Sequence, residues 1–151
     1  MWSRFHVESH VGQLRNYISS LDMALVYILL NNKHALKQAQ EELDLKVGRE
    51  RWVDDQDIKD LVYLQAIVKE TLRLYPLAPL SAPHEAMEDY HVYGYYIPKG
   101  TRVFVNLWKL HRGPRVWDNP DKFLLERFLT KHANINALGK YFEFVPFGFG
   151  R

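Results

Sequence analysis

The chain has 151 residues, of which 47% are hydrophobic, 14% aromatic and 25% charged, and its formal net charge is +2. This apolar content is typical of a globular protein with one core, and the near balance of 20 basic and 18 acidic side chains gives no electrostatic indication of nucleic-acid binding. The sequence contains no cysteine, which excludes a disulfide framework, a thiolate nucleophile and a sulfur-ligated metal within these residues.

The N-terminal region has the composition of neither a signal peptide nor a membrane anchor. Its first residues carry Arg4, His6, Glu8 and His10 among few apolar side chains, and the longest apolar run, residues 23–30, is far shorter than the roughly 18 residues that a transmembrane helix needs. His6 and His10 lack the His-Glu-x-x-His arrangement and a third ligand. Solvated histidines, rather than a zinc site, are therefore expected.

Helical patterns fill the first half of the chain, through about residue 75. The segment HALKQAQEELDLKVG is rich in helix-forming residues and ends on Gly48. A second helix is predicted over LVYLQAIVKETLRLY, with Asp54 or Asp55 as its N-cap and Pro76 beyond its end.

The second half has a different character. Three prolines in PLAPLSAP, residues 76–83, predict an extended connector. The β-rich run that follows contains the turn signal Pro98–Gly100, so we predict a hairpin in which residues 92–96 pair with residues 101–106. Beyond Trp108, aromatic residues between Pro, Gly and Asn predict a long meandering coil packed by its own side chains. The expected fold class is mainly α with a small β portion (α+β).

Three charged residues lie in apolar surroundings. Glu70 and Arg73 stand three residues apart on a helix that is apolar over most of its circumference, and Arg127 lies within the apolar segment FLLERF. Buried charges need partners, and one carboxylate shared by two guanidinium groups would satisfy all three. On these residues alone, the alternative that all three are ordinary surface charges stays open.

Three separated stretches resemble the cytochrome P450 monooxygenases, most closely the plant microsomal members. ETLRLYP resembles their Glu-x-x-Arg helix, FLLERF their Phe-x-Pro-Glu-Arg-Phe segment, and PFGFGR the start of their haem-binding loop. The order and spacing match, with a proline-containing hairpin and WDNPDKF between them. The resemblance implies a partial cytochrome P450 domain over residues 21–151, with helices first and a hairpin and coil after them, and an unassigned N-terminal segment over residues 1–20.

The resemblance also implies the site. In the family this loop continues Phe-x-x-Gly-x-Arg-x-Cys, with Phe147 and Gly150 in the matching places, and the cysteine that ligates the haem (heme) iron would fall three residues beyond Arg151. His84 stands where the family often has a residue that reaches a haem propionate. The stretch that matches the family's substrate pocket contains Ala78, Leu80 and Ser81. No residue is assigned as catalytic or as a metal ligand.

Two positions depart from the family pattern. The family carries an acid followed by Thr on the helix that crosses the haem, whereas here Met23 follows Asp22. Leu125 replaces the usual Pro in FLLERF, which loosens the turn but leaves Arg127 in place.

The function implied by the resemblance is that of a fragment of a haem-thiolate monooxygenase of plant secondary metabolism, acting on a small lipophilic substrate. The expected partners are that substrate and NADPH–cytochrome P450 reductase, with no nucleic acid, and the full-length family resides at the endoplasmic reticulum membrane. The alternative is a non-catalytic truncated remnant or splice product. Because the axial cysteine is missing from this chain, we expect the chain alone to be inactive. The residues do not identify the substrate or the regiochemistry.

Overall fold

A computed structural model describes residues 18–137 and 141–147, so His6, His10 and Gly150 lie outside the described residues. Residues 18–31 are helical. The further helices are α2 (Lys33–Lys46), the 3-10 helix η1 (Ile58–Asp60), α3 (Val62–Leu74), α4 (Leu107–Leu110) and α5 (Glu126–Leu129). The strands are short, and they are β1 (His84–Glu85), β2 (Tyr90–Val92), β3 (Tyr95–Ile97) and β4 (Arg102–Val103). The predicted α+β class, mainly α, is confirmed.

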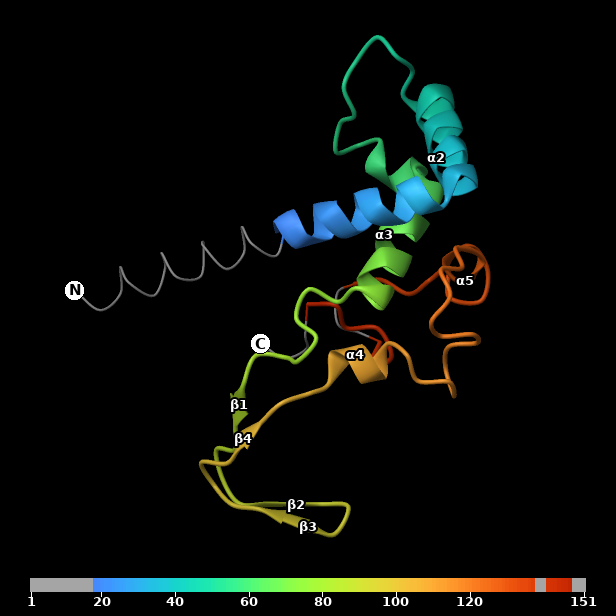
Figure 1. The fold of residues 1–151 in the computed structure, drawn as a ribbon. Helices are drawn as coiled ribbons and strands as arrows, with labels where there is room; N and C mark the ends of the chain where they lie inside the picture. Colours follow the sequence, from blue (N-terminus) through green and yellow to red (C-terminus); the bar gives the residue numbers. More distant parts are fainter. Residues whose placement is uncertain (1–17, 138–140, 148–151) are drawn as a thin grey trace, which may run out of the picture.

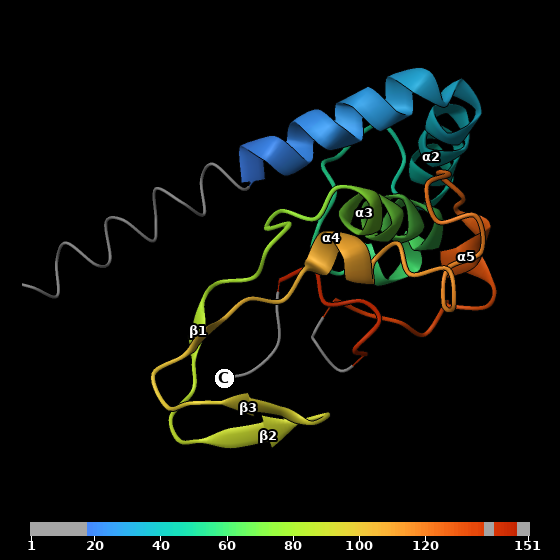
Figure 2. The same ribbon diagram turned by 60° about the horizontal axis from the view of Figure 1, so that its bottom comes forward.

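The helix α2 is the one predicted from its helix-forming residues. It ends at Lys46, and Gly48 then adopts a φ of +82°, a conformation that lets the chain leave the helix with little strain. The residues that α2 buries are small, Ala35 and Ala39, which allows a close approach to α3. Figure 2 shows α3 between α2 and α5.

The N-terminus of α3 differs from the prediction, because neither Asp54 nor Asp55 caps it. A 3-10 helix intervenes, and α3 begins only after Leu61, whose side chain makes no capping hydrogen bond. The first turn is capped by a distant residue instead. The carboxylate of Glu42, on α2, accepts hydrogen bonds from the backbone N–H groups of Tyr63 (2.8 Å) and Leu64 (2.9 Å). Tertiary packing thus replaces the local cap.

The predicted hairpin was wrong in its position. Residues 90–92 pair with 95–97, and β1 pairs antiparallel with β4, so the segment at Pro98–Gly100 connects two different ladders. The two-residue turn lies at Tyr93 and Gly94, whose φ angles of 49° and 85° are both positive, as a type I′ turn requires. The β2–β3 hairpin lies away from the helices in both ribbon views (Figures 1 and 2).

The core forms where the coil after α4, which we call the coil segment (residues 111–137 and 141–147), covers α3. Trp117 and Phe144 from this segment are fully buried, so the coil packs on α3 as well as on itself. The core cluster consists of Ala35, Ala39, Ala66, Ile67, Leu72, Trp117, Leu125, Phe128, Ile135 and Phe144. Within residues 18–137 and 141–147, no helix combines the length and hydropathy required to cross a lipid bilayer.

Candidate functional site

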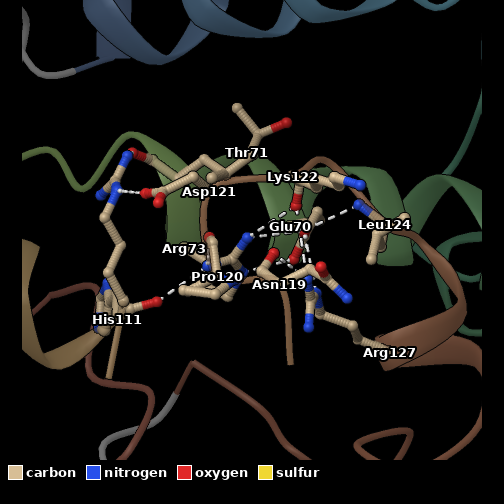
Figure 3. Close-up of polar contacts among 12 residues, drawn as sticks. Glu70, Thr71, Arg73, His111, Asn119, Pro120, Asp121, Lys122, Leu124 and Arg127 are labelled. Carbon is tan, nitrogen blue, oxygen red and sulfur yellow. Dashed lines mark hydrogen bonds and ion pairs between the residues drawn. The ribbon is translucent and has the colours of Figure 1, made fainter. Parts of the chain in front are cut away.

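Helix α3 places Glu70 and Arg73 on one edge, three residues apart, as the sequence predicts for i,i+3 neighbours. The Arg73 Nε atom donates to Glu70 Oε2 at 2.7 Å, and Nη2 donates to Oε1 at 2.8 Å. Both side chains have no solvent exposure. The contact is therefore a buried, bidentate ion pair, drawn in Figure 3.

The third charge comes from α5. The Nε atom of Arg127, a residue that is 8% exposed, lies 3.3 Å from Glu70 Oε1. The same carboxylate oxygen accepts the backbone N–H of Leu124 at 3.0 Å. The structure thus brings the three charged residues singled out in the sequence together, and Glu70 receives donors from α3, from α5 and from the turn before α5 (Figure 3).

Two guanidinium groups around one carboxylate leave one positive charge in excess. Backbone carbonyl oxygens accept hydrogen bonds from further guanidinium donors. The Arg73 Nη1 atom donates to the carbonyls of His111 (2.9 Å) and Pro120 (2.6 Å), and Nη2 also donates to Lys122 at 3.1 Å. Together with its two bonds to Glu70, Arg73 uses all five donors of its guanidinium group. Arg127 Nη2 donates to the carbonyl of Asn119 at 2.8 Å.

The Arg73 guanidinium also lies over an aromatic ring, at 5.4 Å from the centroid of Trp117. Every hydrogen-bond partner of Glu70 is a donor, and its side chain is fully buried. Such a saturated network offers no site for proton transfer to a ligand. Its physical role is to tie α3 to residues 119–127 of the coil segment.

The residues expected at the cofactor lie apart from this network in the chain. His84 is exposed on β1, opposite Val103 of β4. Phe147 is 65% exposed, although it directly follows the fully buried Val145 and Pro146. An apolar ring is thus presented outward by a backbone segment that is anchored in the core.

The three substrate-pocket candidates differ in exposure. The hydroxyl of Ser81 accepts the Val105 N–H at 2.9 Å, and the Ser81 N–H donates to the Val105 carbonyl at 2.9 Å, so Ser81 joins the connector to the strand region. Leu80 is 57% exposed and forms a bridge to Asn106, while Ala78 is half-buried.

The sequence reasoning missed His111. Its side chain is fully buried, and Nε2 accepts the backbone N–H of Val145 at 3.2 Å. Burial, reinforced by the positive charges of Arg73 and Arg112, lowers the pKa of His111 to about 4. No local pattern marks this residue, because its partner is far away in the chain. In the described part of the chain, no group of three or more acidic or histidine side chains is placed to hold a metal ion.

A sequence model of the family described as Cytochrome P450 matches residues 16–151. Among curated proteins, the chain is similar to vinorine hydroxylase of Rauvolfia serpentina, with 53% identity over 99% of this chain and 31% of that protein. It is also similar to nicotine N-demethylase CYP82E3 of Nicotiana tomentosiformis, with 60% identity over 82% of this chain and 24% of that protein.

The fold has a matching neighbour among solved structures. A zebra fish cytochrome P450 described with progesterone superposes with a TM-score of 0.81 and 34% identity, over 95% of this chain and 31% of that chain. The chain therefore spans about a quarter to a third of the length of the proteins it matches. Its helices, short strands and coil correspond to part of that larger fold.

Proposed function

We propose that this chain, which belongs to the cytochrome P450 family, supplies the structural ion-pair core and the start of the cofactor loop of a haem-thiolate monooxygenase. Such an enzyme inserts one atom of molecular oxygen into a small lipophilic molecule. The observation that carries the proposal is the buried network in which Glu70 binds both Arg73 and Arg127. The network holds the coil segment that leads to Phe147 against α3.

Two described residues have side chains suited to contact the edge of a haem. Phe147 presents an exposed apolar ring from an anchored backbone, and His84 is an exposed imidazole that can donate to a propionate. We assign these two residues, with Gly150 of the loop, to cofactor binding. When bound through a cysteine thiolate, haem supplies the oxygen activation on which the reaction depends. The 151 residues contain no cysteine, so they do not supply that ligand themselves.

The proposed substrate is a small lipophilic molecule that contacts the connector around Ala78, Leu80 and Ser81. The exposed Leu80 side chain provides apolar contact area there. The names of the two similar proteins, which refer to vinorine and nicotine, support this class of molecule without selecting either of them.

The remaining assignments follow from the family. We propose that the family domain covers residues 21–151, and that NADPH–cytochrome P450 reductase delivers electrons to the complete enzyme. We also propose that the complete enzyme resides at the endoplasmic reticulum membrane. The small net charge gives no support to a nucleic-acid partner.

The test compares residues 1–151 with the same chain extended in frame by its downstream coding sequence. We expect the extended chain, once supplied with haem, reduced and exposed to carbon monoxide, to give the red-shifted Soret band of a thiolate ligand. Residues 1–151 alone should not give it and should not turn over. A downstream sequence without Arg-x-Cys-x-Gly would favour the non-catalytic alternative, and a thiolate band from residues 1–151 would refute the ligand assignment.

A further inference from the structure

We propose that His111 is a positioning residue, which fixes the start of the cofactor loop by accepting a hydrogen bond from the backbone N–H of Val145. The identity of the loop rests on the proposed function. The contact itself rests on the geometry of described residues, in which Nε2 lies 3.2 Å from the Val145 nitrogen and both residues are fully buried.

The direction of this hydrogen bond defines the state of the imidazole. A ring nitrogen that accepts a hydrogen bond carries no proton, so the proton of the neutral ring is on Nδ1. The surroundings favour this neutral form, because burial and the charges of Arg73 and Arg112 lower the pKa to about 4. The backbone groups of Leu72 and Arg73 raise the pKa in opposition to these effects, but the buried Nδ1 atom has no hydrogen-bond partner in the described part of the chain.

His111 is itself held firmly by its backbone. Its carbonyl accepts a hydrogen bond from Arg73 Nη1 at 2.9 Å, a contact drawn in Figure 3. Its N–H caps the C-terminus of α4 by donating to the carbonyl of Leu107, the first residue of that helix. Its ring packs against Phe144, with the centroids 5.5 Å apart. His111 thus connects two parts of the structure. Its carbonyl binds the ion-pair network, and its ring binds the segment before the loop.

The position of Val145 makes this contact important for the loop. Pro146 has no N–H, so Val145 is the last residue before Phe147 whose backbone can donate a hydrogen bond to the core. Val145 and Pro146 are buried, whereas Phe147 emerges into solvent. The His111 acceptor therefore acts at the point where the chain leaves the core and turns outward.

The competing explanation is that His111 only fills space in the core. Two variants distinguish this packing role from the positioning role. His111→Phe keeps an aromatic ring but removes the acceptor, whereas His111→Gln keeps a side-chain acceptor. The matched control is His132→Gln, because the His132 ring packs at a tilt against Trp117 in the same aromatic cluster, at 4.8 Å between centroids.

The first measurement is amide hydrogen exchange at Val145, in residues 1–151. We expect exchange in His111→Phe to be at least about fivefold faster than in the wild type, because the buried donor loses its partner. His111→Gln should restore most of the protection, and His132→Gln should leave it unchanged. Unchanged exchange at Val145 in a folded His111→Phe variant would overturn the proposal.

If His111→Phe does not fold, the nitrogen chemical shifts of the wild-type ring decide the question. A proton on Nδ1 is the expected result, and a proton on Nε2 would overturn the proposal, since Nε2 could then not accept from Val145.

The second measurement uses the chain extended in frame by its downstream coding sequence, as in the test of the proposed function. We expect His111→Phe to lower the fraction of bound haem that shows the thiolate carbonyl band, and His111→Gln to recover it. An undiminished thiolate fraction in His111→Phe would overturn the positioning role. If the wild type shows no thiolate band at all, the proposed function fails, while the exchange experiment still tests the His111 contact by itself.

Discussion

Replacing Glu70 by Gln should destabilise the fold more than any other single-atom change in the charge network. The Glu70 carboxylate accepts from Arg73 Nε and Nη2, from Arg127 Nε and from the Leu124 N–H. Gln keeps one acceptor oxygen and turns the other position into a donor. At least one guanidinium donor then faces an NH₂ group, and two buried cations are left without an anion.

The size of the effect follows from the burial. Glu70 and Arg73 are fully buried, so water cannot replace the lost partner. Removing one member of such a buried pair costs about 3–5 kcal/mol. The free energy of unfolding of a typical domain is only about 5–15 kcal/mol. Glu70→Gln should therefore remove a large part of the stability of this chain.

The assay is urea unfolding followed by far-ultraviolet circular dichroism. Glu41→Gln is the matched control, because it makes the same chemical change in an exposed i,i+4 pair with Lys37, where the charges are 3.6 Å apart. That pair should contribute less than about 0.5 kcal/mol. If both variants lost the same stability, the argument from burial would be wrong.

Three further predictions follow from other contacts. Arg127→Lys should cost about 1–2 kcal/mol in the same urea assay, because one ammonium cannot reach both Glu70 and the Asn119 carbonyl as the guanidinium does. Gly94→Ala should cost about 1–2 kcal/mol locally, since φ is +85° there, and should speed amide exchange in β2 and β3, whereas Gly113→Ala, at an ordinary backbone conformation, should not. The free energy of unfolding should fall as the pH is lowered from about 6.5 to about 4. In this range His111 binds a proton in the unfolded chain but stays neutral in the folded protein, where its pKa is lowered. This loss should amount to roughly 3 kcal/mol, and His111→Gln should lack it; equal pH profiles for the two proteins would contradict the lowered pKa.

The helices could be predicted because their signals are local. The helix-forming run of α2 and the apolar pattern of α3 are both contained within single segments of the sequence. The cap of α3 could not be predicted, because the carboxylate that supplies it belongs to Glu42, 21 residues before Tyr63. Candidate caps in the adjacent sequence were therefore misleading.

The hairpin shows how two local signals can compete. Pro98 and Gly100 form a real turn, but Tyr93 and Gly94 form the turn that closes the hairpin. A tyrosine at positive φ is uncommon, so residue preferences alone favour the wrong turn. His111 gave no local signal at all, because its partner Val145 is 34 residues away.

The charge network was visible in the sequence for a physical reason that also constrains how the fold assembles. A charge on an apolar helix is costly unless it is paired, so Glu70 and Arg73 stood out. However, one carboxylate cannot compensate two guanidinium groups, and the remaining donors bind carbonyls of Asn119, Pro120 and Lys122. Those carbonyls converge only when the coil segment has its final path. The burial of the charges and the ordering of the coil are therefore one cooperative event, in which neither is stable without the other.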